Sequence, residues 1–174
     1  MNKTEFRNLT KNDESAFLAF VDEFIEAGEK LIPASIDTKG ESFLEWLDKS
    51  EKMANGIELP AGHVPASTYF LLNKESNKIL GAVNIRHALN DFLLKKGGNI
   101  GYGVAPSERR KGYASLMLKN ALAMCGELNM EKAMLSCDRD NIGSNKTIQK
   151  NGGVLENEVR EEDGNVICRY WIEL

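Results

Sequence analysis

The sequence holds little of what marks a secreted, membrane-bound or nucleic-acid-binding protein. Its 174 residues contain 3 cysteines, an odd number without a CxxC pair, which argues against a disulfide framework. No apolar run approaches the roughly 18–20 residues that span a bilayer, and the first residues lack the features of a secretory signal. Lys and Arg number 22 against 26 Asp and Glu, and this net charge of −4 disfavours nucleic acid as the main partner. We therefore expect a cytoplasmic protein that acts without nucleic acid or membrane.

Histidine is also scarce, with 2 residues at positions 63 and 87. No cluster of His, Cys, Asp and Glu has the spacing of a metal site, and no Ser/His/Asp triad is suggested, so we expect no metal. The remaining composition, 42% hydrophobic and 28% charged, is typical of a globular chain. A length of 174 residues predicts one domain, residues 1–174.

The apolar pattern predicts strands and helices in a mixed order. Strands are expected at 6–9, 68–72, 79–85, 99–104, 132–137, 154–159 and 166–172. Helices are expected at about 10–28, from Ser42 where Ser42 and Glu45 form a capping box, at about 113–129 and just before Gly152. Residues 55–65 read as a loop, and 90–98 fit either a helical turn or a loop. This order predicts an α+β fold, a mixed sheet with helices on its faces.

Three consecutive cations, Arg109, Arg110 and Lys111, stand between the strand 99–104 and the start of a helix. A helix N-terminus presents unpaired N–H groups and a partial positive charge, and the adjacent Gly112 lets an anion approach the backbone. These features predict a phosphate-binding turn; the alternative is a solvated basic turn, as charge runs often are. The sequence has neither a Walker motif nor the third glycine of a Rossmann fingerprint.

Residues 109–114, Arg-Arg-Lys-Gly-Tyr-Ala, match the pattern Q/R-x-x-G-x-G/A, and downstream Asn141 opens a short helix that Gly152 closes. In this order the features resemble the GCN5-related N-acetyltransferase (GNAT) superfamily, from about Thr68 to the C-terminus. Arg86-His87 and residues 100–104 further resemble a poorly characterised bacterial branch of predicted acetyltransferases.

The resemblance implies a GNAT-like, mostly antiparallel sheet of six to seven strands with about four helices, splayed between the fourth and fifth strands. Residues 1–67 would then lie on the acceptor side. Residues 68–174 would form the acetyl-CoA-binding core and the C-terminal hairpin.

The resemblance also implies that acetyl-CoA is the cosubstrate. Backbone N–H groups of residues 109–114 would hold its pyrophosphate, and backbone groups of residues 102–104 would pair with the pantetheine arm. The Asn141 side chain would bond the arm from the other side, although capping a helix is an equally simple role for asparagine. The cofactor-binding residues are therefore predicted to be Tyr102, Gly103, Val104, Arg109, Arg110, Lys111, Gly112, Tyr113, Ala114, Asn141 and Ser144.

The implied reaction is direct attack of a neutral amine on the thioester in a ternary complex. Many family members place a tyrosine seven residues after the asparagine to protonate the leaving sulfur, but here that position is Ile148. Ser144 is the nearest hydroxyl in the motif and becomes the candidate acid, with water as the alternative. His87 is the candidate base, because its ordinary pKa of about 6.5 suits proton abstraction near neutrality. A loop histidine held by hydrogen bonds is the alternative role for His87.

Arg86 is a candidate for binding the acceptor, because a guanidinium binds carboxylates in a bidentate manner. If the strand continues through His87, strand alternation places Arg86 and His87 on opposite faces of the sheet. The expected acceptor is a small-molecule amine, with amino acids, polyamines, aminoglycosides and protein N-termini all open. A homodimer would be in keeping with the family. Rival interpretations are a non-catalytic acyl-CoA-binding or sensing module and a nucleotide-binding regulator.

Overall fold

The computed structural model describes residues 3–174, which contain five α-helices and seven β-strands. The strands are β1 (Thr4–Arg7), β2 (Ala66–Asn73), β3 (Ile79–Arg86), β4 (Ile100–Val104), β5 (Lys132–Asp138), β6 (Val154–Arg160) and β7 (Val166–Glu173). The helices are α1 (Glu14–Glu26), α2 (Phe43–Ala54), α3 (Asp91–Lys95), α4 (Tyr113–Glu127) and α5 (Ile142–Lys150). The α+β class is confirmed, and α3 decides the segment that the sequence left ambiguous.

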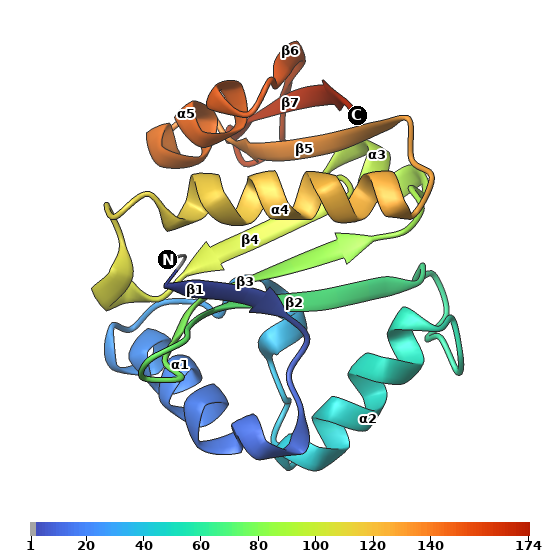
Figure 1. Cartoon of the computed structure of the whole chain (residues 1–174). Helices are drawn as coiled ribbons and strands as arrows, with labels where there is room; N and C mark the ends of the chain where they lie inside the picture. The colour runs from blue at the N-terminus through green and yellow to red at the C-terminus, as the bar shows by residue number, and fades with distance from the viewer. Residues whose placement is uncertain (1–2) are drawn as a thin grey trace.

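The strands form two sheets with the orders β1-β2-β3-β4 and β5-β7-β6, and every ladder in them is antiparallel. Helices α1 and α2 cover one face of the first sheet, and α4 crosses its other side next to β4 and β5 (Figure 1). Two apolar cores result. One lies under α1 and α2 and includes Phe17, Phe20, Phe24, Trp46 and Phe70; the other surrounds α4 and includes Val83, Met117, Leu118, Leu135 and Tyr170.

The helix starts follow local hydrogen-bonding chemistry. The predicted capping box of α2 is confirmed, because Ser42 Oγ accepts from Glu45 N at 3.3 Å and Glu45 Oε2 accepts from Ser42 N at 2.9 Å. The first strand lies earlier than the predicted 6–9. Arg7 is its last paired residue, and the Asn8 side chain then donates to the carbonyl of Thr68 at 2.9 Å, which turns the chain out of the sheet.

The two sheets touch where β4 begins and then part, as the predicted splay requires. Asn99 N donates to Met134 O at 2.6 Å, and Asn99 Oδ1 accepts from Met134 N at 2.9 Å. Gly97 N donates to Ser136 Oγ at 2.8 Å. Within residues 3–174 no ladder joins β4 to β5; an isolated bridge between residues 98 and 135 is their closest approach to one.

The β3–β4 register determines which backbone groups of β4 face the gap between the sheets. Arg86 N donates to Asn99 O at 2.7 Å, and Ala105 N donates to Leu80 O at 3.0 Å. Hydrogen-bonded and non-bonded pairs alternate along an antiparallel ladder, so residues 99, 101, 103 and 105 bond to β3. Residues 100, 102 and 104 therefore turn their N–H and C=O groups toward the open edge.

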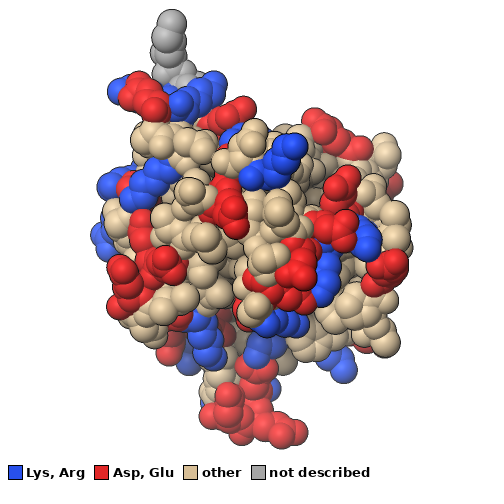
Figure 2. All heavy atoms as spheres, turned by 90° about the horizontal axis from the view of Figure 1, so that it is seen from below, with Lys and Arg blue, Asp and Glu red and all other residues tan. Residues whose placement is uncertain are grey.

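Charged side chains of both signs are interspersed over the face seen from below Figure 1 (Figure 2). No helix within residues 3–174 has both the length and the apolar character that a membrane crossing requires.

Candidate active site

The turn between β4 and α4 carries backbone N–H groups that have no protein partner. Within residues 3–174, no oxygen accepts from the N–H groups of residues 110–115, and the first bond of the helix runs from Leu116 N to Gly112 O at 3.2 Å. Arg110 and Gly112 have left-handed φ angles of 65° and 86°. A Cβ on Gly112 would meet no atom within 4 Å, so the space beside it is open. Such a run of free N–H groups at a helix start suits a bound anion.

The three predicted cations differ in how far their charges are already neutralised. Arg109 forms two bonds to the Glu29 carboxylate, at 2.8 and 2.6 Å, and the pair lowers the pKa of Glu29. Lys111 pairs with Glu108 at 2.8 Å. Arg110 has no ion-pair or hydrogen-bond partner in the part of the chain that the structure describes. Only the Arg110 charge is thus left for a ligand without breaking an existing pair.

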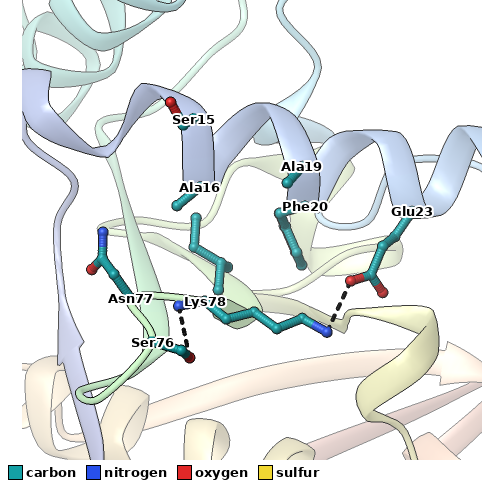
Figure 3. Close-up of a pocket in the computed structure, with 9 residues that line it drawn as sticks. Ser15, Ala16, Ala19, Phe20, Glu23, Ser76, Asn77 and Lys78 are labelled. Carbon is teal, nitrogen blue, oxygen red and sulfur yellow. Dashed lines mark hydrogen bonds and ion pairs between the residues drawn. The ribbon is translucent and has the colours of Figure 1, made fainter.

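An ion network ties this turn to α1. Lys78 contacts Glu108 at 2.9 Å and Glu23 at 3.1 Å, and Glu23 accepts from Ser107 N at 3.2 Å and from Ser107 Oγ at 2.7 Å. Figure 3 shows the Lys78 side chain reaching Glu23 along the edge of an open pocket of about 350 Å³. The pocket is lined by Ser15, Ala16, Ala19, Phe20, Glu23, Ser76, Asn77, Lys78 and Ile79. We call the predicted phosphate-binding turn, residues 109–114, the phosphate turn. The network holds the chain at its start against α1.

Tyr102 places a polar atom beside the gap between the sheets. Its hydroxyl is buried and has no hydrogen-bond partner among the described residues. Burial raises the pKa of Tyr102 to about 12. The nearby hydroxyls of Ser144 and Thr147 partly oppose this rise in pKa, and Cys137 adds to the rise. Neither hydroxyl is placed with the geometry of a hydrogen bond to Tyr102. Tyr102 therefore remains a protonated donor at neutral pH.

Helix α5 is held by two asparagines. Asn141 Oδ1 accepts from Ser144 N at 3.1 Å, so Asn141 caps the helix. Asn145 Nδ2 donates to three carbonyls of residues 138, 139 and 141, and its Oδ1 accepts from Tyr170 OH at 2.6 Å. Sequence reasoning missed Asn145, because nothing in the local pattern marks which amide will join α5 to β7.

Ile148, where the family often has a tyrosine, belongs to the core. It is 1% exposed, and a Cβ on Gly153 would overlap its Cγ2 atom. This position therefore directs an apolar side chain into packed protein and supplies no hydroxyl to the gap.

Arg86 is the last residue of β3 and His87 follows the strand. His87 Nε2 is 2.8 Å from Ser67 Oγ, and burial lowers the pKa of His87. The Arg86 guanidinium donates from Nη1 to the carbonyls of Gly97 and Gly98 at 3.2 and 3.1 Å. No carboxylate within residues 3–174 lies within 4.0 Å of it, and burial lowers its pKa. The structure separates these two predicted substrate residues.

The glycines of β4 lie against the protein's own chain. Gly103 is one of the predicted cofactor-binding residues, and a Cβ on it would overlap the carbonyl oxygen of Ile32. A Cβ on Gly101 would lie 3.9 Å from Pro33 Cβ and 3.6 Å from the Arg86 guanidinium. These glycines leave room for the segment between α1 and α2. Because the segment between α1 and α2 covers this face of β4, a ligand arm has access only to the edge of the strand.

The family model described as an acetyltransferase (GNAT) domain matches residues 4–154. The chain belongs to the GNAT acetyltransferase family. It is therefore an acetyltransferase, and GNAT enzymes use acetyl-CoA. No curated protein matches the chain in sequence.

Solved GNAT structures share the fold at low identity. The ribosomal-protein-S5-alanine acetyltransferase of Vibrio fischeri has a TM-score of 0.74 at 15% identity, with 99% of this chain and 94% of that chain covered. A ribosomal L7/L12 alpha-N-protein acetyltransferase, in complex with coenzyme A as a cysteine disulfide, has a TM-score of 0.71 at 18% identity, with 100% of this chain and 96% of that chain covered. A chimera of spermidine N-acetyltransferases from Vibrio cholerae and human has a TM-score of 0.65 at 17% identity, with 99% of this chain and 96% of that chain covered.

The residues of this GNAT enzyme fit acetyl-CoA. The free N–H groups of residues 110–115 suit its pyrophosphate, and the open edge of β4 offers alternating donors and acceptors for the amides of its pantetheine arm. The Tyr102 hydroxyl adds an unused donor beside the same gap.

Proposed function

We propose that this enzyme transfers acetyl from acetyl-CoA to the primary amine of a small molecule by direct attack in a ternary complex. The observation that carries the proposal is the packing of the segment between α1 and α2 on β4. The Ile32 carbonyl occupies the space that a side chain of Gly103 would need, so the enzyme's own chain already covers this face of the strand. A compact acceptor suits such a covered face better than an extended peptide lying along β4.

In this proposal the cofactor lies along β4 and the phosphate turn. The N–H groups of residues 110–115 bind the pyrophosphate with help from the Arg110 charge. The backbone of Tyr102 and Val104 pairs with the pantetheine amides. Asn141 uses its oxygen as a cap, which leaves its amide nitrogen to donate to the arm.

Acetyl transfer also needs a base and a group that receives the leaving sulfur. His87 contacts a different part of the protein from Arg86, so it accepts the proton of the acceptor ammonium through an intervening water; burial lowers the pKa of His87 and keeps the ring neutral near pH 7. Ser67 Oγ, at 2.8 Å, holds the ring in place. The amine nitrogen then forms a bond to the acetyl carbon and loses its second proton to solvent, and the C–S bond breaks with its electron pair going to sulfur. Ser144 donates a hydrogen bond to that sulfur.

Arg86 indicates the class of acceptor. A guanidinium that is largely removed from water and lacks a carboxylate partner suits an anionic ligand, because charge-assisted bonds to a carboxylate would replace its lost hydration. We therefore propose an amine that carries a carboxylate, as amino acids do.

The test is a thiol-release assay with acetyl-CoA and a panel of amines matched in size, with and without a carboxylate. We expect release with the carboxylate-bearing amines, and Arg86→Gln should raise KM for them at least 10-fold while leaving acetyl-CoA affinity unchanged. Equal use of both amine classes would contradict the role of Arg86. Binding of acetyl-CoA without thiol release from any amine would contradict the proposed function itself.

A further inference from the structure

The Tyr102 hydroxyl is a buried donor without an acceptor. Buried side-chain polar groups are nearly always hydrogen-bonded, so such an atom calls for an explanation. Besides the Tyr102 hydroxyl, only Arg169 Nε is in this state among the described residues, and Arg169 has its Nη2 atom paired with Glu156 at 3.1 Å. Tyr102 OH alone lies beside the gap where the cofactor arm is expected.

Three elements bring polar groups to this point. Tyr102 comes from β4, Ser144 and Thr147 come from α5, and Cys137 comes from the end of β5. Ser144 is partly exposed, and its Oγ makes no hydrogen bond within residues 3–174. The Tyr102 hydroxyl itself is closed off from solvent, so a ligand reaches Ser144 before it reaches Tyr102.

We propose that Tyr102 is a positioning residue that donates its hydroxyl hydrogen to Ser144 Oγ when the cofactor binds, and so directs the Ser144 O–H toward the departing sulfur. This assignment rests on acetyl transfer by this family and on Ser144 contacting the sulfur, and it is independent of the acceptor. It gives the leaving group a donor although Ile148 supplies none.

The electrons and protons balance without a proton leaving Tyr102. As the amine nitrogen bonds to the acetyl carbon it releases one proton to solvent, and the C–S electron pair moves onto sulfur, which departs as a thiolate hydrogen-bonded to Ser144 O–H. The thiolate takes a proton from solvent after release. Burial raises the pKa of Tyr102 to about 12, above the value of about 8.5 for an ordinary thiol, so Tyr102 donates a hydrogen bond and keeps its proton.

The test compares the affinities of CoA and of desulfo-CoA, which lacks the sulfur, by calorimetry at pH 9, where a thiol is largely ionised. The wild-type enzyme should bind CoA more tightly than desulfo-CoA by about 3- to 10-fold, the worth of one hydrogen bond. Tyr102→Phe and Ser144→Ala should each bring this ratio close to one, and the double variant should be no worse than either single variant. Tyr69→Phe, on β2 of the same sheet and stacked on Phe6, is the matched control and should keep the wild-type ratio.

Two more readouts separate this role from a structural one. With an amine that the enzyme turns over, Tyr102→Phe should lower kcat about 10-fold with little change in KM for acetyl-CoA, because the contact strengthens as charge develops on sulfur. The Tm of Tyr102→Phe should equal or exceed that of the wild type, since the removed hydroxyl had no partner. A lower Tm, a wild-type affinity ratio in Tyr102→Phe, or additive losses in the double variant would each overturn the proposal. Failure of the wild type to bind acetyl-CoA would count against the proposed function instead.

Discussion

Arg110 differs from its two neighbours in the phosphate turn because no carboxylate within residues 3–174 pairs with it. We expect Arg110→Ala to weaken acetyl-CoA binding about 10-fold, the lower range for a charge-assisted hydrogen bond. Lys111→Ala should weaken acetyl-CoA binding by less than about 3-fold, since the Lys111 ammonium already pairs with Glu108. Calorimetric titration at low salt measures the acetyl-CoA affinity of both variants, and raising the salt concentration should reduce the difference between the two affinities. Equal losses in the two variants would show that the Lys111–Glu108 pair opens on binding.

The proposed role of His87 as the base predicts a pH dependence for the enzyme. Burial lowers the pKa of His87, so the neutral base persists at pH values below the ordinary histidine value of about 6.5 and is lost only on further acidification. We expect kcat/KM to fall as the pH drops below the lowered pKa of His87. His87→Gln should reduce kcat/KM and remove this acidic decrease. His63→Gln, in the exposed loop 55–65, is the matched control and should retain the wild-type profile. An unchanged acidic decrease in His87→Gln would assign the base elsewhere.

At the scale of residues, the sequence predicts what depends on alternation and cannot predict partners brought together by folding. Period-two alternation separates Arg86 from His87 if the strand continues; β3 ends at Arg86, and the two side chains contact different residues. The partner of Arg109 is Glu29, which lies 80 positions away. Local chemistry does not reveal which carboxylate a distant loop will bring to it. The same limit explains why Ser67, the partner of His87, was missed.

The phosphate turn as an element depends on Gly112, which has φ of 86° with open space beside it. We expect Gly112→Val to cost about 1–2 kcal/mol of folding stability from left-handed strain and to weaken acetyl-CoA at least 10-fold, because the side chain enters the anion space. Gly164→Val is a matched control: its φ is 88°, its surroundings are equally open, and it lies at the turn between β6 and β7. It should lose similar stability by urea denaturation and retain full affinity. Loss of affinity in both variants would point to strain rather than to the site.

Element boundaries were predictable where a side chain marks them. Ser42 and Glu45 fix the start of α2, and the left-handed Asn129, with φ of 58°, ends α4 as its sequence suggests. The first strand was misplaced because four residues give too short a pattern, and its register comes from pairing with β2. The five-residue α3 is too short for any periodicity, and its Asn90 cap is the signal that could have found it.

At the scale of the whole molecule, Asn99 joins the two sheets and is 4% exposed. Its side chain accepts from Met134 N at 2.9 Å and donates to Arg86 O at 3.1 Å. We expect Asn99→Ala to lower the free energy of unfolding by about 2–3 kcal/mol, because two buried backbone groups lose their partners, and to weaken acetyl-CoA by altering the gap. Urea denaturation measures the first effect and calorimetry the second. Asn157→Ala, on the exposed β6, should change neither by a comparable amount. A loss under about 0.5 kcal/mol in Asn99→Ala would show that the sheets are joined elsewhere.

The order of strands and helices was enough to predict the α+β architecture, because short connections limit which strands can pair. The parting of the sheets was expected only from the resemblance to the GNAT superfamily. The covering of β4 was not predictable. Gly103 signals a close approach, but the sequence does not say whether a ligand or the chain itself approaches, and only the position of Ile32 decides it.

The strand order also has a consequence for synthesis on the ribosome. In the first sheet each strand pairs with the one made just before it, so β1-β2-β3-β4 can assemble while the chain is growing, apart from the long connection that precedes β2. In the second sheet β7 lies between β5 and β6, and both neighbours are translated first. Until β7 emerges, the nascent chain carries two unpaired strands, which are exposed to aggregation. Translation of β7 is thus the step that completes the second sheet.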